Sequence, residues 1–533
     1  MRYEIRRSPV FAPRGVVATS QSLAAGAGLA VLRRGGNAID AAIATAVALT
    51  VVQPGSNDIG GDLFALVWDG ERLHGLNASG RSPALLTRDL ALAGATSASD
   101  GLGGHQGDAE LAMPTRGWLP VTVPGAPAGW RDLHARFGSL PFAELFADAI
   151  AYADEGYPVS PRVAEAWRVG AERVYPALAG AEFAEWGRVF TLGGRAPRAG
   201  ERWRNPDAAN TLRRIASTDG EDFYRGDIAN AIVAHAERTG GLLRAGDLAG
   251  HESVWVDPIS VSYRGHEVWE IPPNGQGIAA LVALGVLDGY AEPSLHEQIE
   301  AMKLGFADAH AFVADPGAGG PVRGLLEPGY LAGRRGLIGQ RAGRYGAGEP
   351  GRGGTVYLCT ADSAGRMVSL IQSNYMGFGS YVVPPGTGFG LQDRGAGFVL
   401  AEGHPNAVGP GRRPYHTIIP AFLTRGGEPV GPFGVMGGHM QPQGHVQVVL
   451  STVDGRLDPQ AALDRPRWYW HRGLDVLVEP GLAAEVDGLR RRGHNVFVER
   501  DPGAFGMGQA IWRTAAGYTA GSEPRADGQV MGY

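Results

Sequence analysis

The chain has 533 residues, of which 44% are hydrophobic and 19% are charged, and its formal net charge at pH 7 is -6. These fractions are those of an ordinary globular protein, and the length accommodates one or two large cores. The negative balance provides no basic field that could hold phosphates, so we expect no nucleic-acid partner. Cys359 is the single cysteine, which excludes an internal disulfide and a multi-cysteine metal site.

The N-terminal ten residues carry early charges but no apolar core of the length that a secretion signal needs. The most apolar stretch, residues 41–52, is too short to cross a bilayer and is bounded by polar and Pro-Gly sequences. We therefore expect a buried helix there, no membrane association and a cytoplasmic location.

The first third of the chain alternates helical and extended patterns. Residues 20–34 predict a helix that ends at a pair of glycines, and residues 63–68 predict a strand. Helical patterns dominate residues 140–315, with one strand-like segment at 259–263. The order of elements indicates a mixed α/β protein rather than an array of repeats.

The single lysine of the chain, Lys303, lies in a predicted helix over residues 295–310. A lysine nucleophile or Schiff base would have to use this residue. Because Ile299, Met302 and Phe306 share the apolar face of the helix, we expect Lys303 to be solvated instead.

Residues 317–354 are dense in Gly, Arg and Pro and show almost no apolar periodicity, so they predict a flexible connector. Two β-rich runs follow, 355–361 and 366–373, and they predict a hairpin. Pairing residue 361 with residue 366 brings Thr355 opposite Gln372 and beside Ser373.

Taken alone, Thr355 is a β-branched residue at the start of a strand, for which a structural role is the simpler interpretation. The preceding connector and Gly354 favour a second hypothesis, in which the chain is cut between Gly354 and Thr355. The α-amine released on Thr355 would have an ordinary pKa of about 8 and could serve as general base for the hydroxyl of its own residue.

Acyl transfer also needs hydrogen-bond donors for the developing oxyanion. The pair Gly437 and Gly438 offers consecutive backbone N–H groups without side chains, although a tight glycine turn is the simpler interpretation of the pair alone. Arg81 follows a predicted strand and could bind a substrate carboxylate through its planar guanidinium, or it could cap surface carbonyls.

Several stretches of the sequence, taken in order and spacing, resemble the γ-glutamyltransferase family over nearly the whole chain. They are residues 35–42 (GGNAIDAA), 123–129 (VPGAPAG), 300–316, 354–355, 406–410 (NAVGP), 437–438 and 521–525 (GSEPR). Each stretch is weakly specific by itself, and the combination carries the resemblance.

This resemblance implies a four-layer αββα sandwich of the N-terminal-nucleophile hydrolase type. It also implies a proenzyme that cuts itself into a large subunit, residues 1–354, and a small subunit, residues 355–533, with a homodimer of such pairs as an option. No cofactor and no metal are implied.

Carried over by position, the resemblance assigns Thr355 as the nucleophile and Ser373 as the hydroxyl residue that orients the amine of the nucleophile. It assigns Gly437 and Gly438 to the oxyanion hole, and Arg81 to the carboxylate of the acyl donor.

The sequence departs from the family where the glutamyl group is bound. Typical members hold the α-amino group through a glutamine and an aspartate in a stretch N-N-Q-M-D-D, whereas this chain has Arg394 and Gly397 there. His416 and Thr417 replace the paired serines that hold the α-carboxylate. We expect Arg394, His416 and Thr417, together with Asn374 and Tyr375 after Ser373, to contact the substrate.

The changes are similar to those of the acylase-like branch of the family. We expect an enzyme that cleaves γ-glutamyl or related carboxylated acyl amides, with glutaryl or cephalosporin acylase and oxamate-type amidohydrolase activities as alternatives. A γ-glutamyl preference would link it to glutathione metabolism. Two other hypotheses are a cysteine hydrolase built on Cys359 and a non-catalytic family member.

Overall fold

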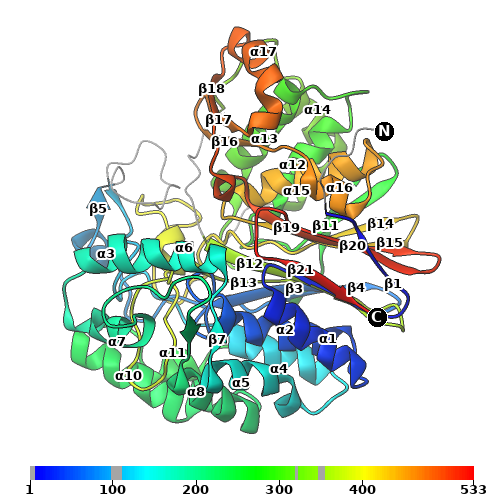
Figure 1. Cartoon of the computed structure of the whole chain (residues 1–533). Coiled ribbons are helices and arrows are strands. Elements are labelled where there is room, and N and C mark those ends of the chain that lie inside the picture. The colour runs from blue at the N-terminus through cyan, green and yellow to red at the C-terminus, as the bar shows by residue number, and fades with distance from the viewer. Residues whose placement is uncertain (1–6, 98–110, 319–321, 346–353) are drawn as a thin grey trace.

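The computed structural model describes residues 7–97, 111–318, 322–345 and 354–533. Two seven-stranded antiparallel sheets lie face to face, and helices cover the outer face of each sheet (Figure 1). This architecture is the four-layer αββα sandwich expected from the resemblance.

Both sheets combine strands from distant parts of the chain. The first sheet has the order β21 (Gln529–Gly532), β2 (Val16–Thr19), β12 (Gly354–Ala361), β13 (Met367–Tyr375), β3 (Asp62–Trp68), β4 (Leu73–Asn77) and β9 (Val254–Val256). The second sheet has the order β1 (Val10–Ala12), β20 (Gly517–Ser522), β19 (Met507–Thr514), β15 (Glu428–Met436), β14 (Ala421–Arg425), β11 (His266–Glu270) and β10 (Ile259–Tyr263).

Two groups of helices form the outer layers (Figure 1). Below the first sheet lie α1 (Ser22–Arg33), α2 (Ala38–Val52), α4 (Ala126–Phe137), α5 (Ala147–Glu155) and α8 (Pro206–Ser217), and beside them α3 (Arg88–Ala93), α6 (Pro161–Val169), α7 (Ala184–Phe190), α9 (Glu221–Arg225), α10 (Asp227–Thr239) and α11 (Ala245–Ala249). Over the second sheet lie α12 (Gly277–Leu287), α13 (Leu295–Phe312), α15 (Met440–Val453) and α16 (Pro459–Asp464).

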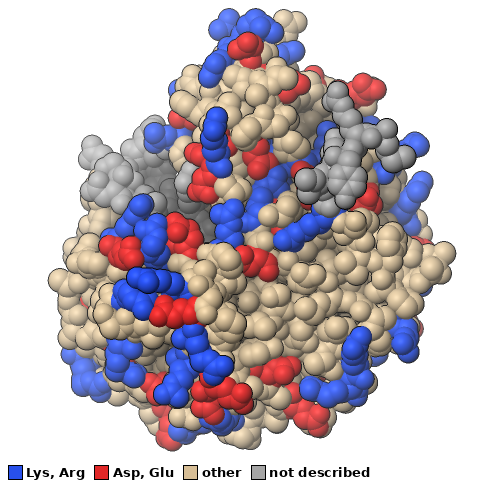
Figure 2. Space-filling model, viewed as in Figure 1, with Lys and Arg blue, Asp and Glu red and all other residues tan. Residues whose placement is uncertain are grey.

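A small unit projects beyond the second helical layer. It contains α14 (Pro328–Arg335), α17 (Val486–Arg491) and a three-stranded sheet of β16 (Trp468–Arg472), β17 (Asp475–Val478) and β18 (Asn495–Val498). Figure 2 shows basic side chains gathered at the tip of this projection, whereas charges of both signs are interspersed over the rest of the visible face.

Helix α2 confirms the prediction of a buried apolar helix. All of its side chains are buried, and a capping box between Asn37 and Asp40 satisfies the backbone N–H groups at its start. None of the described helices combines the length and the apolar character that spanning a bilayer would demand.

The hairpin of β12 and β13 is confirmed, but the predicted register is wrong by one residue. Ala361 pairs with Met367 rather than with residue 366. Arg366 lies instead opposite Asp362, whose backbone N–H donates to the carbonyl of Arg366. A bulge between Gly354 and Val356 then leaves Thr355 next to Ser373, as predicted.

The prediction of a flexible connector over residues 317–354 is wrong for residues 322–345. This part contains α14, whose Leu331 is buried against α12, and Arg335 Nε donates to the carbonyl of Val286 at 2.8 Å. Widely spaced apolar residues among many glycines and arginines are enough to dock the segment on the core. Residues 319–321 and 346–353 of the predicted connector lie outside the described residues.

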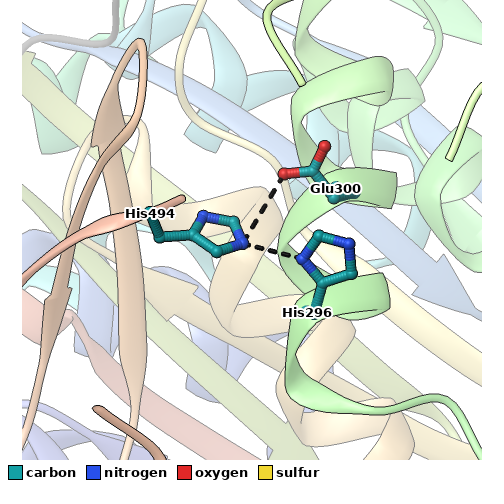
Figure 3. A group of neighbouring side chains, drawn as sticks. All are labelled: His296, Glu300 and His494. Carbon is teal, nitrogen blue, oxygen red and sulfur yellow. Dashed lines mark hydrogen bonds and ion pairs between the residues drawn. The ribbon is translucent and has the colours of Figure 1, made fainter. Parts of the chain in front are cut away.

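The expectation that Lys303 is solvated is also wrong. Its ammonium is buried, donates to Glu300 Oε1 at 2.6 Å and has a pKa lowered by burial. Figure 3 shows Glu300 and His296 projecting from α13 toward His494, whose Nε2 lies 2.8 Å from His296 Nδ1. Although the carboxylate and the two imidazoles could ligate a metal, Lys303 already supplies a cation to Glu300.

Asp58, in the turn between α2 and β3, makes stability depend on pH. Burial raises the pKa of Asp58 from 3.8 to about 8, so the folded state holds a proton that the unfolded state releases. A raised carboxyl pKa stabilises the fold fully when the pH is below the pKa of the unfolded state. This contribution is lost as the pH rises toward the pKa of the folded state. We expect the free energy of unfolding, measured by urea titration, to fall between about pH 4 and pH 8, and to fall less in Asp58→Asn. Equal slopes in both proteins would contradict this assignment.

Candidate active site

Thr355 and Ser373 lie side by side on the two strands of the central hairpin. Thr355 is the second residue of β12 and is buried, and its Oγ1 lies 3.2 Å from Ser373 Oγ. Ser373 Oγ also accepts a hydrogen bond from the backbone N–H of Tyr375 at 2.8 Å. The predicted pair of hydroxyl residues is therefore assembled by the strand pairing.

Arg394 connects this pair of hydroxyl residues to Thr417, in the loop before β14. Its Nη2 donates to Ser373 Oγ at 3.1 Å, its Nη1 donates to Thr417 Oγ1 at 2.7 Å, and its guanidinium lies 4.4 Å from the centre of the Tyr375 ring. The Arg394 guanidinium and the Tyr375 N–H hold Ser373 Oγ beside Thr355 Oγ1, and either hydroxyl can donate the hydrogen bond between them.

Gln441 is a contact of Thr355 that the sequence reasoning missed. Its Nε2 donates to Thr355 Oγ1 at 3.4 Å, while its Oε1 accepts from the backbone N–H of Ile419 at 3.1 Å and fixes the orientation of the amide. Gln441 belongs to the first turn of α15, three residues after Gly438. Its position just after the predicted oxyanion glycines was the available signal.

Gly437 and Gly438 form the sharp connection between β15 and α15. Their φ angles are +132° and +60°, and a Cβ on Gly437 would lie 3.1 Å from the Cα of Gly506. Both positions therefore favour glycine over other residues. Gly437 also lines a cavity of about 130 Å³ to which Thr355 contributes.

A buried pair of Asp62 and His416 lies behind the Arg394 cluster. The two side chains are fully buried, and His416 Nε2 lies 3.0 Å from Asp62 Oδ2. Burial, and then the charge of Arg394, lower the pKa of His416 well below its ordinary value, whereas burial raises the pKa of Asp62 to about 7. His416 is thus a neutral imidazole, and its described hydrogen bonds are to Asp62 and to the backbone N–H of Ile418. The sequence held no signal for Asp62.

The structure does not bring the side chain of Arg81 into this cluster. Its guanidinium is about half exposed, pairs with Asp315 at 2.9 Å and donates to the carbonyl of Gly411 at 2.8 Å. Asn374, in contrast, is fully buried, and its amide oxygen and nitrogen have no hydrogen-bond partner among the described residues. Asn374 therefore retains its capacity to bind a ligand.

Cys359 lies on β12, the strand that also carries Thr355. It is fully buried, and burial raises the pKa of its thiol well above the ordinary value. A neutral buried thiol is a poor nucleophile, so the cysteine-hydrolase hypothesis has no support in the structure.

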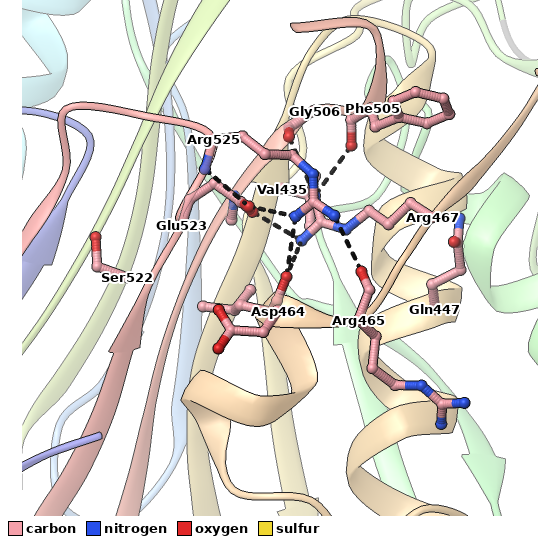
Figure 4. A network of polar contacts seen from close by, with 12 residues as sticks. Val435, Gln447, Asp464, Arg465, Arg467, Phe505, Gly506, Ser522, Glu523 and Arg525 are labelled. Atoms are coloured by element: carbon pink, nitrogen blue, oxygen red, sulfur yellow. Dashed lines mark hydrogen bonds and ion pairs between the residues drawn. The ribbon is translucent and has the colours of Figure 1, made fainter. Parts of the chain in front are cut away.

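A buried ionic network surrounds Arg467, Glu523 and Arg525 (Figure 4). Arg467 Nη1 donates to the carbonyls of Phe505 and Gly506 at 3.0 and 3.1 Å, and its Nη2 pairs with Glu523 at 2.8 Å. Glu523 also accepts from Arg525 at 2.5 Å. The network fixes Gly506, which lines the cavity and whose Cα would lie 3.1 Å from a Cβ on Gly437.

The chain matches one protein family and several known proteins along nearly its whole length. The family model described as Gamma-glutamyltranspeptidase matches residues 24–533. A glutathione hydrolase-like YwrD proenzyme of Bacillus subtilis (strain 168) is 34% identical, over 98% of this chain and 99% of the relative. An oxamate amidohydrolase proenzyme of Klebsiella pneumoniae is also 34% identical, over 97% of this chain and 98% of the relative.

A solved structure is more similar still. The crystal structure of a cephalosporin acylase from Bacillus halodurans is 50% identical in sequence and has a TM-score of 0.93, and the match covers 100% of this chain and 98% of that one. The family model spans almost the entire sequence, and these relatives are matched along nearly their full lengths. The chain therefore belongs to the gamma-glutamyltranspeptidase family of enzymes that hydrolyse or transfer amides.

Proposed function

We propose that the chain cuts itself between Gly354 and Thr355 and then uses Thr355 to hydrolyse or transfer small carboxylated acyl amides. The observation that carries this proposal is the set of contacts made by Thr355 Oγ1, which lies beside Ser373 Oγ and the Gln441 amide. The cut would divide the protein into a large subunit, residues 1–354, and a small subunit, residues 355–533. The proenzyme names of the relatives support such processing.

In the cut protein, the α-amine of Thr355 takes the proton of its own hydroxyl as Oγ1 attacks the acyl carbon. A bond forms between Oγ1 and this carbon, and the carbonyl oxygen becomes an oxyanion that the N–H groups of Gly437 and Gly438 stabilise. The carbon–nitrogen bond then breaks, and the proton passes to the leaving amine. Water or a second amine then attacks the acyl carbon, the bond between this carbon and Oγ1 breaks, and the α-amine passes the proton of the attacking group to Oγ1.

The charge of Arg394 supports an acyl donor that carries a carboxylate. A guanidinium binds carboxylates through paired hydrogen bonds and repels an ammonium, so it cannot replace the glutamine and the aspartate that typical family members use for an α-amino group. Arg394 Nε is buried and has no hydrogen-bond partner among the described residues. The amide of Asn374, which also has no partner among them, lies on β13 directly after Ser373. A glutaryl, oxamyl or similar donor fits this arrangement, and a γ-glutamyl donor is the alternative.

A panel of anilides that differ only in the acyl group tests this specificity. We expect glutaryl or oxamyl anilides to have higher kcat/KM values than the γ-glutamyl anilide. A clear preference for the γ-glutamyl anilide would overturn the altered specificity while leaving the nucleophile intact.

We predict that Arg394→Gln lowers kcat/KM for carboxylated donors roughly 10- to 100-fold, since a hydrogen bond to a charged group contributes about 1.5–3 kcal/mol. Turnover of an uncharged butyryl anilide is the control, because it reports the effect of the substitution on Ser373 and Thr355 alone. An equal loss of kcat/KM for the carboxylated and the butyryl donors would contradict a role of Arg394 in carboxylate binding.

The cytoplasmic location, the role in glutathione metabolism and the homodimer expected from the sequence stay predictions. Arg81 also stays a predicted carboxylate ligand, and it would have to exchange its contact with Asp315 for the substrate.

A further inference from the structure

The cavity beside Thr355 does not include the Arg394 cluster. The described residues that line it come from the ends of β12 and β15, the residue after β2, the turn after α2, the first turns of α6 and two segments near the C-terminus. Thr355 and Gly437 contribute to its lining, whereas Arg394, Thr417 and Asn374 do not. Thr355 thus separates two environments, a fully buried polar cluster and an open cavity of about 130 Å³.

Most of the cavity lining is apolar. Pro54, Val163, Ala166, Met436 and Met507 supply this surface. Such a lining favours the carbon skeleton of a ligand over bulk water, and orientation then depends on a small number of polar groups. Two of the lining side chains carry a charge, Arg162 and Asp527.

The charge of Asp527 is already used by the protein. Its Oδ2 accepts the backbone N–H groups of Arg162 and Val163 at 2.8 and 3.3 Å, at the N-terminus of α6. Carboxylates at a helix N-terminus are stabilised by these unpaired N–H groups and by the helix dipole. Asp527 therefore caps α6 and, through the same contact, fixes the backbone of Arg162 at the edge of the cavity.

The guanidinium of Arg162 is exposed and has no hydrogen bond or ion pair with any residue in the described part of the chain. By contrast, Arg168 on the same helix pairs with Glu165 and Glu172. Arg162 is thus a cation available at the edge of the cavity that contains the proposed nucleophile. Arginine suits planar carboxylate ligands because its N–H groups form a rigid fork.

We infer that this cavity receives the amine half of the substrate and that Arg162 binds a carboxylate carried by that half. The inference rests on the proposed function, which assigns the acyl half to the Arg394 side of Thr355. Its ligand class is an amine with an apolar body and a carboxylate, such as an amino acid, a short peptide or an aminobenzoate. Arg162 makes or breaks no bond in the reaction, and it acts by binding and orienting the group that leaves or accepts.

Two substrates with the same acyl group separate this role from acyl recognition. One is the para-nitroanilide, and the other is its analogue with a carboxylate on the ring. The measured quantity is the ratio of their kcat/KM values, compared between wild type and Arg162→Gln. We expect the kcat/KM of the carboxylated anilide, divided by that of the uncharged anilide, to be about 10-fold lower in Arg162→Gln than in wild type, mainly because KM for the carboxylated anilide rises. High salt should lower the same ratio in wild type.

The matched control is Arg168→Gln, which removes an exposed arginine of the same helix outside the cavity and should leave the ratio unchanged. An unchanged ratio in Arg162→Gln would overturn the inference. So would a result in which Arg162→Gln alters the choice between glutaryl and butyryl donors, because the carboxylate at Arg162 would then belong to the acyl half.

A binding measurement keeps the inference testable without turnover. The two free amines, para-nitroaniline and its ring-carboxylated analogue, are titrated into wild type and Arg162→Gln by calorimetry. We expect the carboxylated amine to bind wild type more tightly, and this difference to disappear in the variant. If neither anilide is turned over but this difference is seen, the proposed reaction fails and the amine site stands; equal binding of both amines to wild type overturns the site.

Discussion

Replacing Thr355 by alanine is expected to leave the protein as one 55.9 kDa chain and to abolish turnover. Alanine has no hydroxyl to attack the carbonyl of Gly354 or an acyl donor, while the methyl group preserves the strand. A denaturing gel with N-terminal sequencing of the fragments reports the cut, and an anilide assay reports the catalysis. Wild type should give two fragments, the smaller one beginning with Thr355.

Thr355→Ser is the matched variant for this experiment. It retains the hydroxyl next to Ser373 and should keep both the cut and measurable turnover. Full activity in an uncut Thr355→Ala protein would refute the proposed nucleophile. An uncut, inactive wild type would instead support the non-catalytic hypothesis.

Breaking the buried ionic network is expected to have the largest effect on stability. In Arg467→Met, Glu523 loses one of its cations and the carbonyls of Phe505 and Gly506 lose their donor. Removing one partner of a buried ion pair costs about 3–5 kcal/mol, and we expect a loss near the lower end of this range because Arg525 still pairs with Glu523. The free energy of unfolding from urea titration of the uncut Thr355→Ala protein measures this cost without the complication of two fragments.

Arg513→Met provides the control for the network. Arg513 is about half exposed and lies 3.7 Å from an exposed Glu428, so its removal should change stability by no more than about 0.5 kcal/mol. Equal losses in the two variants would show that the network around Arg467 is not especially stabilising.

The elements that sequence reasoning predicted are those specified by local pattern. Helix α2 and the hairpin of β12 and β13 follow from apolar runs, caps and a turn, and the hairpin alone brings Thr355 to Ser373. The one-residue error in register shows the limit of this reasoning, because the turn is closed by backbone and side-chain bonds of Asp362 that composition does not reveal.

The features that were missed depend on contacts between distant segments. Lys303 is buried because Glu300, on the same helix, is itself enclosed by residues about 40 positions further along the chain. Asp62 and Gln441 reach the site from strand and helix ends whose neighbours appear only in the folded sheets. Periodicity describes one helix or strand at a time, so it cannot predict contacts between residues that are distant in the sequence.

The order of strands has a consequence for the cut protein. In the first sheet, β12 and β13 are inserted between β2 and β3, and in the second sheet, β1 and β11 flank strands from beyond residue 354. Each of the two fragments would therefore lack the hydrogen-bonding neighbours that complete its own sheets. Once separated, they would have to find each other by diffusion, so heat inactivation of the mature protein should be far harder to reverse than unfolding of the single chain.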